Sequence, residues 1–212
     1  FVLLAKGLAE RIRSVPRSLR LVKTSLVSPG SKQDAARSCG QTKNVKFYLG
    51  THHPNWLWAD PPMTSSLFVS HRRLRRQNRY KPATVDWALD SGGFTELNMY
   101  GRWQTTSATY VAAVRRYDAE IGRLQWAAPQ DWMCEAVVLG RTGLDVGIHQ
   151  RRTIESVLEL RDLAPEIHWI PVLQGRDAPD YLAHAEQYER AGIDLVGEPL
   201  VGLGSVCRRA ND

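Results

Sequence analysis

Short apolar runs alternate with longer helical patterns along the chain from about residue 45 onward. Such alternation is typical of β-α units that build a parallel sheet. The apolar runs predict six strands, at Val45–Leu49, Leu67–Ser70, Val85–Leu89, Leu124–Ala128, Ile167–Leu173 and Asp194–Val196. Six strands with intervening helices fit either a doubly wound sheet or an unfinished (β/α)8 barrel, and periodicity alone does not choose between them.

The clearest helices are predicted between the later strands. Ser107 can cap the first of them, because a serine hydroxyl accepts from a free N–H of the first turn. A second helix is predicted over Val146–Leu163, where apolar residues recur at helical spacing. Pro179 favours the start of a third helix, and Gly192 favours its end.

The first 43 residues differ from the rest of the chain in charge. They hold nine Lys/Arg against two acidic residues, whereas the remainder of this chain of net charge +6 is close to neutral. A weak helical pattern covers Val2–Leu8, and we interpret residues 1–43 as a basic leader, either linker or disordered, before a domain at 44–212. A basic leader can steer a protein to phosphate backbones, or it can be a targeting peptide.

Composition narrows the setting of the protein. The hydrophobic fraction of 43% is enough for one sizeable core. No apolar stretch approaches the roughly 20 residues of a membrane span, so we expect no membrane association. Cys39, Cys134 and Cys207 lie far apart, which argues against a disulfide framework and against a cysteine-rich zinc site. A cytoplasmic location fits best.

Polar and glycine residues follow four successive predicted strands. They are the Asp90–Thr95 segment, Asp131 with Trp132–Glu135, Gln174-Gly175, and the glycine-rich stretch Gly197–Ser205. Chemistry in both candidate folds gathers at the carboxyl ends of strands. A site of this composition favours a planar, hydrogen-bonding ligand. Each segment also has a plainer interpretation, since Asp90 and Asp131 suit a tight turn and a helix cap.

These ordered motifs resemble a family of base-exchange enzymes. Asp90–Phe94, Asp131 with Cys134, Gln174-Gly175 and Gly202–Gly204 resemble the motifs of tRNA-guanine transglycosylases. Further segments are more similar to phage and bacterial relatives that place 7-deazaguanine bases in DNA, namely Phe47–Pro54, Phe68–Leu74, Trp126–Glu135 and Gly202–Arg209. The resemblance covers roughly Val45 to Arg209.

The resemblance implies a fold and a reaction. The fold is an eight-stranded (β/α)8 barrel, of which about six strands are present here. The reaction displaces guanine from its sugar through a covalent sugar–enzyme intermediate and inserts a 7-deazaguanine. The resemblance gives Asp90 the role of general acid and base, and Phe94 that of stacking on the base. Base contacts are implied for Ser91, Gly92, Gly93, Asp131, Gln174, Gly202, Leu203 and Gly204.

Two features of the family fall outside this sequence. The nucleophilic aspartate lies on the last barrel strand, well beyond the glycine segment, and Asp212 is too close to that segment to take its place. The tRNA enzymes also carry a Cys/His zinc site in that later region, so we expect no metal and no other cofactor in this chain. We therefore expect an incomplete barrel that is inactive on its own, because an open barrel leaves strand edges unpaired.

A basic run follows the second predicted strand. Residues 71–81 hold six Lys/Arg and no acidic residue. Such runs are often solvated loops, but this one lies on the expected active face, where it suits contact with a sugar-phosphate backbone. The candidate residues for DNA contact are Arg72, Arg73, Arg75, Arg76 and Arg79. For His52 and His53 we favour backbone or phosphate contact over metal binding.

The sequence thus predicts a transglycosylase that replaces guanine in DNA with a derivative such as 7-cyano-7-deazaguanine. Two alternatives stay open. One is a tRNA-guanine transglycosylase, and the other is a non-catalytic nucleic-acid-binding remnant. The target base of a duplex would have to be flipped out of the stack before Asp90 could reach it.

Overall fold

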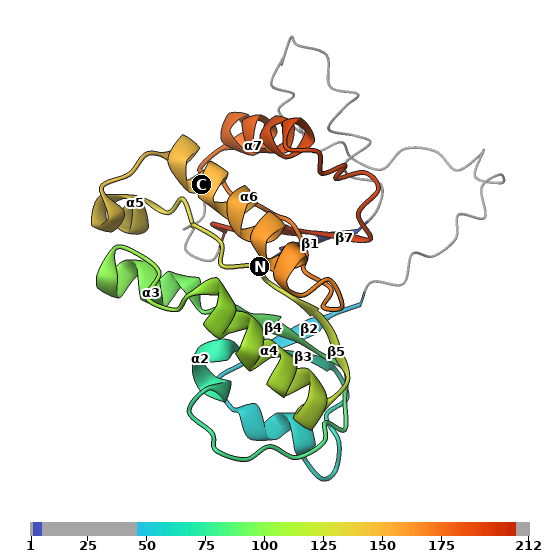
Figure 1. The fold of residues 1–212 in the computed structure, drawn as a ribbon. Coiled ribbons are helices and arrows are strands. Elements are labelled where there is room, and N and C mark those ends of the chain that lie inside the picture. The colour runs from blue at the N-terminus through green and yellow to red at the C-terminus, as the bar shows by residue number, and fades with distance from the viewer. Residues whose placement is uncertain (1, 6–45, 207–212) are drawn as a thin grey trace, which may run out of the picture.

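The computed structural model describes residues 2–5 and 46–206. Its strands form two hydrogen-bonded groups (Figure 1). The parallel group has the order β2-β3-β4-β5, and the second group has the order β1-β7-β6. The strand bounds are β1 Val2–Ala5, β2 Tyr48–Thr51, β3 Ser66–Ser70, β4 Trp87–Asp90, β5 Leu124–Ala127, β6 Val172–Leu173 and β7 Leu200–Leu203.

A single parallel bridge between Ala127 and Trp169 joins the two groups. With this bridge, β2 to β7 follow one another in sequence order, and all the pairings among them are parallel. A doubly wound sheet requires a reversal of strand order, which does not occur among the described strands. The α/β class is therefore confirmed, whereas a closed barrel is not, because no pairing joins β1 or β7 to β2 in the described part of the chain.

The parallel sheet is strongly curved. In a flat sheet, β2 and β5 would lie about 14 Å apart, since neighbouring strands are separated by about 4.8 Å. The Tyr48 ring of β2 nevertheless contacts the Trp126 ring of β5, with centroids 5.5 Å apart. Phe68 of β3 also contacts Trp126, at 5.3 Å. These side chains share an apolar cluster with Ala88, Ile170, Val172 and Leu200, so the strands β2 to β7 or residues beside them all contribute to one inner face.

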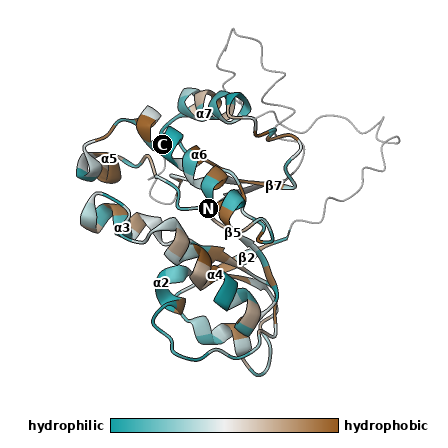
Figure 2. Ribbon diagram, viewed as in Figure 1, coloured by the Kyte–Doolittle hydropathy of each residue, from teal (hydrophilic) through white to brown (hydrophobic). Residues whose placement is uncertain are grey.

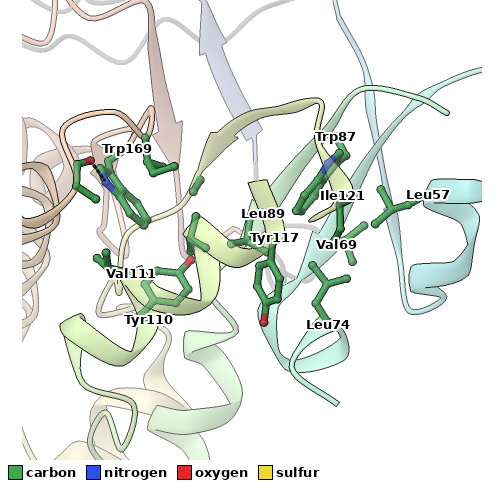
Figure 3. Packing of buried hydrophobic residues seen from close by; sticks show 14 of the residues in the cluster. Leu57, Val69, Leu74, Trp87, Leu89, Tyr110, Val111, Tyr117, Ile121 and Trp169 are labelled. Atoms are coloured by element: carbon green, nitrogen blue, oxygen red, sulfur yellow. Dashed lines mark hydrogen bonds between the residues drawn. The ribbon is translucent and has the colours of Figure 1, made fainter. Parts of the chain in front are cut away.

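Helices cover the outer face of the sheet (Figure 1). Their bounds are η1 Pro54–Trp58, α2 His71–Leu74, α3 Gly93–Tyr100, α4 Ser107–Ile121, α5 Ala136–Thr142, α6 Val146–Leu163 and α7 Ala178–Arg190. Figure 2 shows hydrophilic residues on the outer sides of these helices and hydrophobic residues along the strands. In the main core, Tyr110 of α4 packs against Trp169, whose indole N–H donates to the Ala164 carbonyl at 3.0 Å (Figure 3).

Two of the predicted helices have the expected bounds. Val146–Leu163 is confirmed as α6, and its cap is Asp145, which accepts from the Ile148 N–H. The helix predicted from Pro179 is α7, with the proline in its first turn. The expected cap of α4 was wrong by one residue. Thr106 accepts from the Thr109 N–H, whereas Ser107 donates to Glu159 at 2.7 Å.

The predicted strand at Asp194–Val196 was wrong. Asp194 instead forms a turn, because its carbonyl accepts from the N–H groups of Gly197 and Glu198 and its carboxylate accepts from Val196. Leu195 of this segment is buried beside α7, which explains the strand-like pattern. The real strand, β7, begins at Leu200.

Other differences concern the ends of elements. The strand predicted over Ile167–Leu173 is reduced to β6, because Pro171 has no N–H to donate to a ladder. The first parallel strand begins at Tyr48, and Val45 lies outside the described residues. The helical pattern at Val2–Leu8 was also wrong for Val2–Ala5, which form β1 antiparallel to β7. The rest of the predicted leader lies outside the described residues.

Candidate functional site

Asp90 is placed at the carboxyl end of β4, beside Ser70 at the end of β3. Its carboxylate accepts from the Ser70 hydroxyl and from the Gly92 N–H. Gly92 has φ +80°, a conformation that favours glycine, and it turns the chain directly into α3. Burial raises the pKa of Asp90, and the two hydrogen bonds oppose this shift only in part. A raised pKa favours the protonated form of a carboxyl group, which is the form that a general acid requires.

A cavity of about 240 Å³ opens beside Asp90. Phe94 and Thr95 of α3 form one wall, and Ser70 and Gly92 lie at the strand ends. Its other lining residues are basic: His52, Arg72, Arg73 and Arg76. The cavity therefore combines a carboxyl group, an aromatic ring and several cationic side chains, which suits a ligand that is planar in one part and anionic in another.

The structure divides the basic run into two sets. Arg72, Arg73 and Arg76 line the cavity. Arg75, on the same short segment, instead contacts Glu96 of α3 at 3.3 Å. Arg79 is exposed and does not line this cavity. The sequence had assigned all five arginines to DNA contact, and the structure brings only three of them to the cavity that holds Asp90.

Asp131 lies behind the cavity and not in it. Its side chain is fully buried, and both carboxylate oxygens accept hydrogen bonds. Ser91 donates to one oxygen at 3.1 Å, and the Gln174 amide donates to the other at 2.6 Å. Burial, together with the charge of Asp90, raises the pKa of Asp131 to about 7. The two carboxyl groups thus lie at the same edge of the sheet, but only Asp90 lines the cavity.

The network continues from Gln174 to the end of β7. Gln174 accepts from the Ser205 hydroxyl at 2.6 Å, and the same hydroxyl oxygen accepts from the Cys134 N–H at 2.6 Å. The Gln174 N–H donates to the buried His184 ring at 2.8 Å, where burial lowers the histidine pKa to about 4. Ser91, Asp131, Gln174 and Ser205 therefore form a continuous buried chain across four strand ends.

The glycine segment, for which the family resemblance implies base contacts, lies at the end of β7. Gly202 and Leu203 are residues of β7, and they pair with β6 on one side and with β1 on the other. Gly204 lies directly after the strand, and a Cβ there would overlap the Gln174 amide. Gly93 is similarly enclosed, with Trp103 2.6 Å from the position of a Cβ. These glycines permit close packing around the network.

Sequence reasoning missed some residues of the site. Ser70 and Ser205 were not assigned roles. Each lies at the carboxyl end of a strand, and this position could have indicated that they belong to the site. His184 was likewise not assigned a role, although its ring accepts from the Gln174 N–H. His52 lines the cavity, whereas the neighbouring His53 stacks on Trp56 with ring centroids 5.5 Å apart.

The fold and the site together define an α/β protein with a cavity at its strand ends that holds a carboxyl group, an aromatic ring and basic side chains. The chain belongs to the DpdA family, described as DeoxyPurine in DNA protein A, whose family model matches residues 43–212. Membership of this family supports a DNA-modifying role of the transglycosylase type, with DNA as the substrate. No curated protein and no solved structure matches the chain. None of the described helices is both long and apolar enough to cross a bilayer.

Proposed function

We propose that this protein exchanges guanine in DNA for a 7-deazaguanine derivative, with Asp90 as the general acid and base. The observation that carries the proposal is the shared cavity of Asp90 and Phe94, which places a proton-transferring carboxyl beside an aromatic surface. Exchange breaks the bond between the sugar and guanine, and the departing base takes up a proton. The incoming base releases a proton when the new bond forms. One carboxyl that alternates between its two forms serves both steps.

The Asp131–Gln174 pair is proposed to read the edge of the base. In the free protein, each oxygen of Asp131 already has a donor. The N1–H and exocyclic amine of guanine are two donors in one plane, and they would replace Ser91 and Gln174 as partners. The released Gln174 amide would then contact the base itself. This exchange keeps the buried carboxylate satisfied, which matters because an unpaired buried charge is costly.

The complete catalytic domain is proposed to be a (β/α)8 barrel that continues beyond these strands. The sequential order of the parallel strands and their shared inner apolar cluster support this proposal. The nucleophilic carboxylate that takes the sugar is expected from a later strand, as the family resemblance implies.

Incorporation of labelled 7-cyano-7-deazaguanine tests the proposal. The product of the complete reading frame is incubated with DNA or with tRNA, and the label retained in each polymer is measured. We expect label in DNA and none in tRNA. Label in tRNA alone would contradict the DNA assignment, and the absence of label in both polymers would contradict base exchange with this base.

A further inference from the structure

Three arginines of the cavity beside Asp90 form no ion pair with any other residue that the structure describes. Among the described residues, no carboxylate lies within 4.0 Å of the side chains of Arg72, Arg73 or Arg76. Several arginines elsewhere pair with a carboxylate, as Arg75 does with Glu96 and Arg161 with Glu198. Unpaired guanidinium groups that converge on one cavity favour an anionic ligand, and their planar fork suits phosphate oxygens.

The turn after β4 holds the stem of Arg72 against the site. A Cβ on Gly92 would lie 2.7 Å from Cγ of Arg72 and 3.2 Å from its Cδ. The absence of a side chain at Gly92 therefore allows Arg72 to lie directly over the Asp90–Gly92 turn. His52, from the loop after β2, lines the same cavity. The basic side chains thus come from the segments that follow β2 and β3, and they line the same cavity as the carboxyl group.

The size of the cavity limits what this anion can be. A volume of about 240 Å³ is below the roughly 300 Å³ at which sites for ordinary small molecules begin. It holds the space of roughly eight water molecules at about 30 Å³ each. That space is enough for one phosphate together with the edge of a base, and the open side of the cavity would admit the rest of the strand.

We propose that Arg72, Arg73 and Arg76, with His52, hold one phosphodiester of the DNA strand next to the nucleotide that Asp90 acts on. This inference rests on the proposed function and deepens it, because it assigns backbone recognition to three of the arginines in the basic run. Arg75 is instead a positioning residue that ties α2 to α3 through Glu96. Held in this way, the phosphate would fix the register of the strand while the base lies between Asp90 and Phe94.

The salt dependence of DNA binding tests the site without any need for catalysis. The slope of log K against log salt is measured for a guanine-containing duplex with the complete protein and with Arg73→Gln and Arg76→Gln. Because these side chains share one phosphate, we expect each substitution to lower the magnitude of the slope by up to about 0.9, the value for one phosphate contact to B-DNA. Arg79→Gln is the matched control, since Arg79 is in the same run but outside the cavity, and its slope should stay unchanged. Arg76→Lys should keep most of the wild-type slope.

Each outcome separates the site from its alternatives. Equal slope changes in Arg73→Gln, Arg76→Gln and Arg79→Gln would overturn the proposal. They would mean that residues 71–81 bind DNA as a basic surface without a specific phosphate site. Unchanged slopes in the two cavity variants would also overturn it. Calorimetric binding of inorganic phosphate, lost in the cavity variants while the DNA slope stays constant, would assign the cavity to free phosphate instead. A reduced slope without any base exchange would retain the phosphate site and reject the proposed reaction.

Discussion

The Ser91 hydroxyl donates to Asp131 at 3.1 Å and so joins the residue after Asp90 to the end of the next strand. The Asp131 carboxyl group therefore contacts the residue next to Asp90, and the charge of Asp90 contributes to the raised pKa of Asp131. A proton gained or lost by either group alters the other. A charge on Asp90 therefore favours the protonated form of Asp131.

The raised pKa of Asp131 predicts a pH dependence of stability. Its value of about 7 in the folded protein exceeds the ordinary value of about 3.9 in the unfolded chain. Between these values the folded state holds a proton that the unfolded state has lost, so the free energy of unfolding decreases as the pH rises from about 4 to about 7. The contribution is at most about 1.4 kcal/mol per pH unit.

Urea unfolding of wild type and Asp131→Asn across this pH range measures the effect. Because asparagine does not titrate, we expect the free energy of unfolding to fall more steeply with pH in the wild type than in Asp131→Asn. Identical pH profiles would mean that Asp131 has an ordinary pKa, and the coupling to Asp90 would then be absent.

Close packing at Gly204 predicts that alanine is destabilising there, whereas alanine at the open position Gly140 is not. A Cβ at Gly204 would overlap the Gln174 amide, which is held by Asp131 and Ser205. Gly204→Ala should therefore lower the free energy of unfolding by about 1–3 kcal/mol. Gly140→Ala is the control, because Gly140 lies in α5 with no atom within 4 Å of a Cβ. That change should stabilise the protein by about 0.5–1 kcal/mol. Equal effects of the two substitutions in denaturant titrations would contradict the packing described.

Glu96 is predicted to be the stabilising member of its ion pair with Arg75. The buried Glu96 carboxylate accepts from the N–H groups of Gln104 and Thr105, from the Thr105 hydroxyl and from Arg75. Burial raises its pKa, but these hydrogen bonds outweigh that effect and lower the pKa overall. Glu96→Gln should cost about 2–3 kcal/mol, since hydrogen bonds to a charged group are strong.

Arg75→Gln provides the comparison, because the Arg75 side chain is 42% exposed. Its loss should cost less than about 1 kcal/mol, as for other exposed partners. Thermal unfolding of both variants checks the difference, and a larger cost for Arg75→Gln would show that the ion pair rather than the backbone contacts stabilises α3.

The sequence predicted the fold where local signals were strong. Asp145 and Pro179 are residue types that favour the start of a helix, and they lie at the starts of α6 and α7. The apolar runs of β3, β4 and β5 are bounded by polar residues. It failed where tertiary contacts decided the outcome. Leu195 is apolar because it is buried beside α7 and not because it lies in a strand, and only the three-dimensional arrangement shows this.

The site was predicted in the same uneven way. The position of Asp90 at a strand end could be inferred from its sequence context, because parallel strands end on one edge. The sequence could not show which arginines line the cavity. Arg73 and Arg75 are neighbours in the same short segment, and the direction of each side chain depends on the local backbone. The burial of Asp131 depends on Ser91 and Gln174, which lie 40 and 43 positions away in the chain.

Base exchange by the Asp90→Asn variant tests the central claim most directly. The product of the complete reading frame and its Asp90→Asn variant are compared for the initial rate of labelled 7-cyano-7-deazaguanine incorporation into DNA, with DNA affinity measured in parallel. We predict a loss of about 10²–10⁴-fold in rate, the usual contribution of a general acid–base group, with DNA affinity preserved. A variant that incorporates the base at the wild-type rate would contradict the account.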